Sequence, residues 1–235
     1  MTGHPPVVNN GRSLPALQLP RGLYAVCDDG VRPDLSLPEQ ARLLVAGEVQ
    51  VAQVRCKQLR GRAAWEAVRD AVGVLRRGGV VALVNDRVDW ALLSGADGVH
   101  VGDEDLPPAE ARAVLGPGRL VGVTVRNADG AHAAARDGAS YVGLGPLFPT
   151  RTKSVTAPVL GLERLRREVA DSPLPVIAIG GIGLESIAEV ARSGAHGAAV
   201  LSDLWHAADV PARAKLLHAR FVLGETGTSA STRVE

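Results

Sequence analysis

Short apolar segments alternate with longer amphipathic segments along most of the chain. The short segments are rich in β-branched residues and are bounded by Gly, Pro, Asp or Asn, as buried parallel strands are. They comprise residues 23–27, 49–55, 80–84, 97–101, 119–125, 140–145, 175–179 and 197–201. The pattern predicts a parallel β-sheet whose strands are connected by helices.

The amphipathic segments predict those helices. Residues 63–77 place apolar side chains at spacings of three and four residues, which is typical of a helix packed on a sheet. Residues 184–195 repeat this spacing, so we expect a helix that begins near Leu184 and stops at Gly194.

A recurring transition favours one repeated strand–helix unit over two different domains. "LSGADGVHV", "RDGASYVGL" and "RSGAHGAAV" each place Gly-Ala between a helix and the next strand. Eight such units close a (β/α)₈ TIM barrel, which is the predicted fold class, α/β. An open doubly wound sheet is the alternative, but the turn "CDDGVRPD" after the first strand lacks the expected G-x-G-x-x-G.

The 235-residue chain divides into one domain and two tails. We expect a flexible tail over residues 1–20, a barrel over 21–222 and a second flexible tail over 223–235. The Pro-rich start does not resemble a secretory signal, and no apolar run approaches a membrane span.

Charge and cysteine content narrow the class further. The formal net charge of +1 favours neither nucleic acid nor an anionic membrane as a partner, so any anion site must be local. Cys27 and Cys56 form no C-x-x-C motif, which favours reduced thiols and a cytoplasmic location. The sequence leaves open whether the chain forms a homo-oligomer.

The second predicted strand carries unusual charge. Gln53, Arg55 and Lys57 alternate with Val54 and Cys56, so the polar set should share the face that lines the barrel lumen. A buried strand rarely contains charged side chains without a partner, and two cations on one face favour a multiply charged anion such as diphosphate.

Carboxylates follow the next two strands. Asn85 and Asp86 end the third strand, and "GDED" with Asp105 follows the fourth. Taken alone, Asp86 is better interpreted as a helix start, and "GDED" as a solvated turn. Beside the cations they predict a Mg²⁺–diphosphate site, because Mg²⁺ is usually held by one or two carboxylates plus phosphate oxygens.

The last two strand ends predict a second anion site. Gly180, Gly181 and Gly183 permit close backbone approach to a ligand, and a helix should start just after them. Barrels often bind phosphate there. His100, between two valines, is interpreted as a core or lumen residue rather than as a ligand.

Taken together, these motifs resemble the thiamine-phosphate synthase family. The matching segments are "QVRCK" (53–57), "ND" (85–86), "DGVHVGDED" (97–105), "YVGLGPLFPTRTK" (141–153), "AIGGI" (178–182) and "VLS" (200–202). The resemblance implies a transferase that couples a hydroxymethylpyrimidine diphosphate to a hydroxyethylthiazole phosphate, with Mg²⁺ as cofactor. The products would be thiamine phosphate and diphosphate, formed through a pyrimidine carbocation.

The resemblance also assigns residues. It implies Asp86 and Asp105 as Mg²⁺ ligands, and Arg55, Lys57, Thr124 and Lys153 as catalytic residues. The substrates would be held by Gln53, Val54, Arg55, Cys56, Lys57, Asn85 and Lys153 around the pyrimidine diphosphate, by Thr150, Thr152, Gly181, Leu201 and Ser202 around the thiazole phosphate, and by Thr124 and Arg151.

Four positions depart from the family pattern. Thr124 replaces the usual Ser, Arg126-Asn127 replaces the usual His-Thr, and Asp103 replaces the usual Gln. Two other functions stay open: a thiazole tautomerase on a related barrel, and a non-catalytic ligand-binding paralogue. The stretch "GVTVRN" lacks the His associated with the tautomerase, and the retained cations and carboxylates argue against a paralogue without activity.

Overall fold

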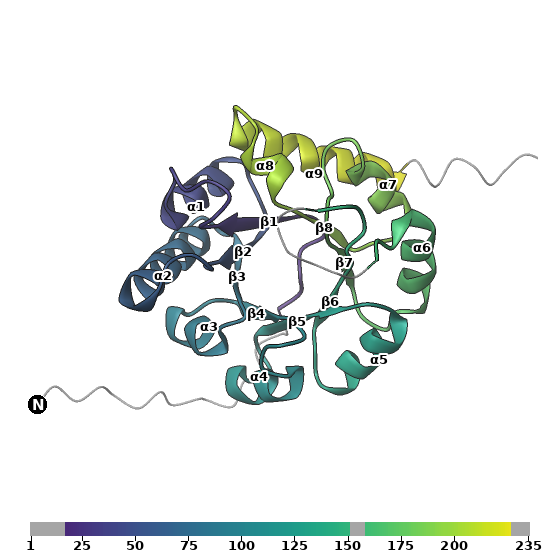
Figure 1. The fold of residues 1–235 in the computed structure, drawn as a ribbon, viewed down its shortest axis with the longest axis horizontal. Helices are drawn as coiled ribbons and strands as arrows, with labels where there is room; N and C mark the ends of the chain where they lie inside the picture. Colours follow the sequence, from purple (N-terminus) through teal and green to yellow (C-terminus); the bar gives the residue numbers. More distant parts are fainter. Residues whose placement is uncertain (1–16, 151–157, 227–235) are drawn as a thin grey trace, which may run out of the picture.

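The predicted barrel is confirmed. A computed structural model describes residues 17–150 and 158–226, and its eight parallel strands pair in sequence order into a closed barrel. Figure 1 shows the strands as a central ring with the helices outside it. The barrel closes where β1 pairs with β8, with Leu23 opposite Ala198 and Ala25 opposite Val200.

Each apolar segment predicted as a strand overlaps one. The strands are β1 (Gly22–Asp28), β2 (Val51–Arg55), β3 (Val81–Asn85), β4 (Gly98–Val101), β5 (Leu120–Val125), β6 (Tyr141–Leu144), β7 (Val176–Ala178) and β8 (Gly197–Val200). The helices are α1 (Leu37–Ala46), α2 (Gly61–Arg77), α3 (Val88–Ser94), α4 (Pro108–Leu115), α5 (Ala128–Arg136), α6 (Gly161–Asp171), α7 (Ile187–Arg192), α8 (Ser202–Trp205) and α9 (Val210–Thr226).

Alternation along the strands divides the buried side chains into two clusters. On β1, Leu23 and Cys27 pack outward against the helices, whereas Tyr24 and Val26 point into the lumen. The lumen cluster consists of Leu19, Tyr24, Val26, Val51, Leu83, Leu120, Tyr141 and Ile177. This packed cluster therefore lies beneath the side chains at the barrel mouth, which is formed by the carboxyl ends of the strands.

The packed chain extends beyond the expected domain at both ends. Leu19 is only 7% exposed and belongs to the lumen cluster, and His196 Nε2 donates a hydrogen bond to its carbonyl oxygen at 2.9 Å. A single leucine in a Pro-rich stretch has no periodicity that would predict this. At the other end, α9 continues to Thr226, and Arg21 forms an ion pair with Glu225.

The seventh helix starts later than the spacing predicts. The backbone N–H groups of Ser186 and Ile187 both donate to the carbonyl oxygen of Gly183, at 3.1 and 2.9 Å, so a turn precedes α7. Apolar spacing reports which face is buried and does not mark where helical hydrogen bonding begins. Among the residues that the structure describes, no helix has both the length and the apolarity to cross a membrane.

Candidate active site

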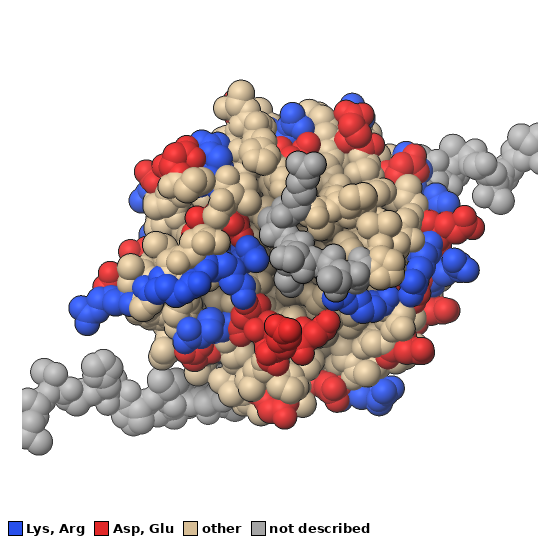
Figure 2. Space-filling view, viewed as in Figure 1, with Lys and Arg blue, Asp and Glu red and all other residues tan. Residues whose placement is uncertain are grey.

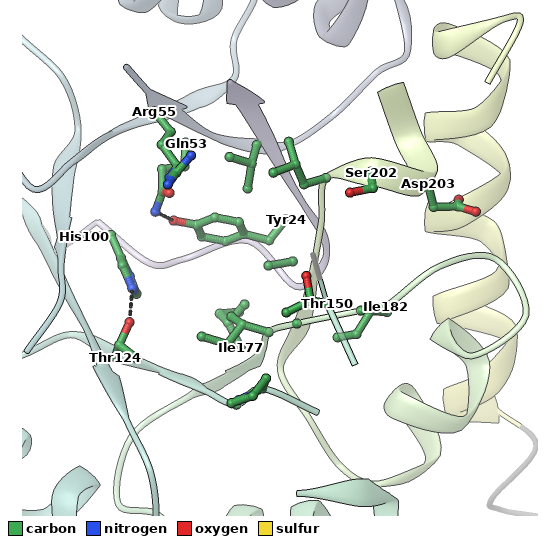
Figure 3. Close-up of a pocket in the computed structure, with 18 of the residues that line it drawn as sticks. Tyr24, Gln53, Arg55, His100, Thr124, Thr150, Ile177, Ile182, Ser202 and Asp203 are labelled. Atoms are coloured by element: carbon green, nitrogen blue, oxygen red, sulfur yellow. Dashed lines mark hydrogen bonds between the residues drawn. The ribbon is translucent and has the colours of Figure 1, made fainter. Parts of the chain in front are cut away.

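The barrel mouth opens into a central cavity of about 660 Å³. Figure 3 shows Gln53, Arg55, His100 and Thr124 on one side of it, and Thr150, Ser202 and Asp203 on the other, with Tyr24 between them. Residues from both predicted anion sites therefore line the same cavity: Gln53 and Arg55 from the first, and Thr150 and Ser202 from the second.

The β2 side chains follow the predicted alternation as far as Arg55. Gln53 is 6% exposed, and its Nε2 donates to the hydroxyl oxygen of Tyr24 at 2.9 Å. Gln53 and Arg55 both line the central cavity, whereas Val54 packs in the outer cluster beneath the helices. This is the arrangement that the period-two pattern predicts.

Lys57 does not share that lumen face. Together with Val54, Cys56, Asp86 and Asp105 it lines a second cavity of about 460 Å³, outside the central one. The reason is that β2 ends at Arg55, so alternation no longer determines the direction of Lys57. Asn85 lines both cavities and so marks their common wall.

The predicted metal-binding carboxylates meet in the second cavity. Asp86 has a φ of 63°, and its N–H donates to the carbonyl oxygen of His100 at 2.8 Å. Its carboxylate forms an ion pair with the Lys57 ammonium. Burial raises the pKa of Asp86; Lys57 opposes this, and the neighbouring Asp105 carboxyl adds to it.

A chain of hydrogen bonds crosses the cavity floor. The hydroxyl oxygens of Tyr24 and Tyr141 lie 3.0 Å apart, and Tyr141 Oη lies 3.1 Å from His100 Nδ1. His100 Nε2 in turn lies 3.1 Å from Thr124 Oγ1. Burial raises the pKa of both tyrosines, so both stay neutral. His100 is thus a lumen residue, as expected, but one with partners in the cavity.

At the β7–β8 end, Thr150, Gly181, Leu201 and Ser202 line the central cavity. Gly181 has a φ of 68°, and a Cβ there would lie 2.6 Å from the carbonyl oxygen of Pro149. Only glycine fits this close approach. The predicted sites at Arg151, Thr152 and Lys153 lie outside the described residues.

The departures at Asp103, Arg126 and Asn127 each make local contacts. Asn127 caps α5, because its Oδ1 accepts from the N–H of Gly130 at 2.9 Å. Arg126 lines the central cavity, where its Nη1 donates to Gly145 O at 3.2 Å. Its Nη2 lies 3.5 Å from an Asp103 carboxylate oxygen, so each supplies a counter-charge for the other.

Several cavity residues were not predicted. Tyr24, Tyr141, Arg126, Asp203 and His206 all line the central cavity. The two tyrosines occupy lumen positions of their strands. Alternation along those strands, as used for Gln53 and His100, could therefore have predicted them. Asp203 and His206 follow β8 in a helix and a turn, where strand alternation predicts nothing.

Charge at the mouth is unevenly placed. Figure 2 shows Lys and Arg side chains (blue) gathered over α2 and the end of β2, beside Asp and Glu side chains (red) on the β4–α4 side. The second cavity lies where these regions adjoin, because Lys57 comes from one and Asp105 from the other. Among the described residues, no group of three His, Cys, Asp or Glu side chains is placed to hold a metal ion.

Comparison with known proteins identifies the family. The sequence model of the family described as thiamine monophosphate synthase matches residues 23–204, which include all eight strands apart from the first residue of β1. The chain belongs to the thiamine-phosphate synthase family. It is therefore an enzyme of the transferase class, and the resemblance inferred from the motifs is confirmed.

Curated relatives and a solved structure agree. The chain is 58% identical over 209 residues to a thiamine-phosphate synthase from Myxococcus xanthus, covering 89% of this chain and 96% of the relative. One from Anaeromyxobacter dehalogenans is 46% identical, covering 82% and 86%. A solved thiamine phosphate pyrophosphorylase from Pyrococcus furiosus is 33% identical with a TM-score of 0.78, covering 86% of this chain and 96% of that one.

Proposed function

We propose that the protein is a thiamine-phosphate synthase. It would join 4-amino-2-methyl-5-(diphosphooxymethyl)pyrimidine to 4-methyl-5-(2-phosphooxyethyl)thiazole and release thiamine phosphate and diphosphate. The observation that carries this proposal is the pair of sites at one barrel mouth. Cations and carboxylates adjoin at the ends of β2 to β4, opposite the glycine-lined site at β7 and β8.

The chemistry balances without a protein nucleophile. The bond between the pyrimidine methylene carbon and the diphosphate oxygen breaks, and both electrons leave with diphosphate. The thiazole nitrogen then donates its lone pair to the carbocation and forms the new C–N bond. Arg55, Lys57 and Lys153 would stabilise the charge that develops on the leaving diphosphate.

The carboxylate pair fits Mg²⁺. The nearby Asp105 carboxyl adds to the burial that raises the pKa of Asp86, and a bound divalent cation would favour the charged form of Asp86. Two carboxylates are what Mg²⁺ commonly takes from a protein when substrate phosphates supply further oxygens. When bound, Mg²⁺ would neutralise charge on the diphosphate.

The remaining residues have positioning and binding roles in this proposal. Gln53 and Asn85 would hold the pyrimidine diphosphate from the central cavity, while Val54 and Cys56 line the second cavity beside it. Thr150, Thr152, Gly181, Leu201 and Ser202 would hold the thiazole phosphate, with Arg151 close by. Free thiols at Cys27 and Cys56 accord with a cytoplasmic location.

The test is a coupling assay with purified protein. Both substrates and Mg²⁺ should give thiamine phosphate and one equivalent of diphosphate, and omission of either substrate should abolish both products. Rearrangement of the thiazole substrate without diphosphate release would instead support a tautomerase. Binding of both substrates without any product would support a non-catalytic paralogue.

A further inference from the structure

Two adjacent carboxylates at the end of β1 have no role in the site described so far. They are Asp28, the last residue of β1, and Asp29, which follows it. Asp28 lies within the strand and Asp29 in the turn after it, and their carboxylates reach different targets. Both targets belong to the segment that carries Arg55 and Lys57.

Asp28 holds the guanidinium of Arg55. The two residues lie opposite each other in the β1–β2 pairing, and Asp28 Oδ2 forms an ion pair with Arg55 Nη1. The other carboxylate oxygen accepts from the N–H groups of Gly30 and Val31, at 2.8 and 3.1 Å. With one nitrogen held, the remaining donors of the planar guanidinium are restricted in direction.

Asp28 is itself fixed from behind by a buried side chain. Gln40 of α1 is 0% exposed, and its amide bonds to both backbone groups of Asp28: Nε2 donates to the carbonyl oxygen, and Oε1 accepts from the N–H, each at 2.9 Å. Asp28 is only 3% exposed. The carboxylate that orients Arg55 therefore cannot readily turn towards another partner.

Asp29 holds the backbone of the turn that follows β2. Its Oδ1 accepts from the N–H of Lys57 at 2.7 Å, and its Oδ2 accepts from those of Gln58 and Leu59, both at 2.8 Å. Burial alone would raise the pKa of Asp29, but these donors outweigh it and hold the pKa below its usual range. The turn is thus fixed while the Lys57 ammonium reaches Asp86.

We propose that Asp28 and Asp29 are positioning residues for diphosphate binding: Asp28 orients the guanidinium of Arg55, and Asp29 fixes the backbone from which Lys57 extends. This inference rests on the proposed function, because it takes diphosphate as the anion. It predicts the direction in which the affinity for diphosphate changes. Removing a carboxylate near an anion site should strengthen anion binding if charge alone matters, and should weaken it if orientation matters.

The experiment measures the binding of inorganic diphosphate with Mg²⁺ by calorimetry, and the KM of each substrate. Asp28→Asn keeps an oxygen for Gly30 and Val31 but removes the charged partner of Arg55. By analogy with other residues that orient ligand-binding groups, we expect about 10- to 100-fold weaker diphosphate binding. The KM of the pyrimidine diphosphate should rise, while that of the thiazole phosphate should not change.

Double-mutant cycles separate orientation from general destabilisation. Asp28→Asn should have little further effect when Arg55 is already Gln, and Asp29→Asn little further effect when Lys57 is already Gln. Asp97→Asn is the matched control. Asp97 also accepts a backbone N–H, from Ala82 at 2.9 Å, and pairs with Arg76, but it precedes β4 at the opposite end of the barrel. This variant should have a lower melting temperature than the wild type, with both KM values unchanged.

Each outcome bears on one of the two ideas. The positioning role of Asp28 would be overturned if Asp28→Asn bound diphosphate more tightly, or if it lost the same affinity with and without Arg55. The positioning role of Asp29 would be overturned by the same results for Asp29→Asn, with and without Lys57. If the wild type binds diphosphate and the variants weaken that binding as expected, but the wild type forms no thiamine phosphate, the proposed function is overturned and the positioning roles stand. Wild-type protein that neither binds diphosphate nor turns over would overturn both.

Discussion

His100 Nε2 lies 3.1 Å from the hydroxyl oxygen of Thr124, at the end of the hydrogen-bond chain that begins at Gln53. The Tyr24 hydroxyl oxygen accepts from the Gln53 amide; when its own hydrogen is also bonded within this chain, it donates to Tyr141, and Tyr141 donates to His100 Nδ1. His100 then carries its proton on Nε2 and donates it to Thr124. The hydroxyl hydrogen of Thr124 is left to donate towards the cavity.

We expect Tyr141→Phe to destabilise the fold. The change removes the hydroxyl between Tyr24 and His100 and leaves both without that partner in a buried site. Losing a partner there costs about 1–3 kcal/mol of unfolding free energy. Urea denaturation measures it, and an unchanged midpoint and slope would show that the chain contributes nothing to stability.

Thr124 tests whether a directed hydroxyl matters for catalysis. Thr124→Ser keeps the hydroxyl and should retain most of the activity, whereas Thr124→Val keeps the shape and removes the donor. We expect Thr124→Val to lower kcat/KM by about 10²–10³-fold, as for other lost preorganised donors. Equal activity of the two variants in steady-state coupling assays would assign Thr124 a packing role only.

The carboxylate pair should make turnover depend on Mg²⁺. Asp86→Ala or Asp105→Ala should nearly abolish coupling, since each leaves one carboxylate for the ion. Asp103→Gln is the control: its pairing with Arg126 is exposed and 3.5 Å long, so its loss should cost little. Full activity in excess chelator would contradict the metal assignment.

The Cys56 thiol predicts a stability change in alkaline solution. Burial, followed by the hydrogen bond to Asp29 and its charge, raises the pKa of Cys56 to about 12. The pKa of a thiol in an unfolded chain is about 8.5. The unfolded chain therefore loses this proton first, so the contribution is complete below about pH 8.5 and falls as the pH rises towards 12.

Melting temperatures between pH 7 and 10.5 measure this effect. The wild type should lose stability over this range faster than Cys56→Ala, because the variant lacks the titrating group. Parallel curves for the two proteins would show that the thiol does not contribute.

Leu19 should contribute as much to the free energy of unfolding as a core residue does. Leu19→Ala opens space in the lumen cluster, and such changes cost about 2–5 kcal/mol of unfolding free energy. Leu93→Ala is the control, because Leu93 on α3 is 70% exposed and its truncation should change stability by less than about 0.5 kcal/mol. Similar denaturation curves for both variants would mean that Leu19 does not support the barrel.

The strands and helices could be predicted from the sequence, because burying one face of each element spaces its apolar residues at a regular period. The phase of Gln53, Val54 and Arg55 follows directly from alternation within β2. Lys57 lies beyond the end of that strand, so the same rule placed it in the central cavity, although the turn held by Asp29 directs it to Asp86.

Pairings between distant segments were not predictable in the same way. Asp103 and Arg126 are separate anomalies in the sequence, and only the closed barrel brings the loops after β4 and β5 together. Leu19 likewise has no neighbours in sequence that mark it as buried. Such residues act through tertiary contacts that leave no local pattern.

The ion pair between Arg21 and Glu225 brings the two ends of the described chain together at the start of β1, on the side opposite the cavity mouth. A tether attached beside Arg21 or Glu225 would therefore lie away from the cavity mouth, and protein immobilised at this point would keep that mouth accessible.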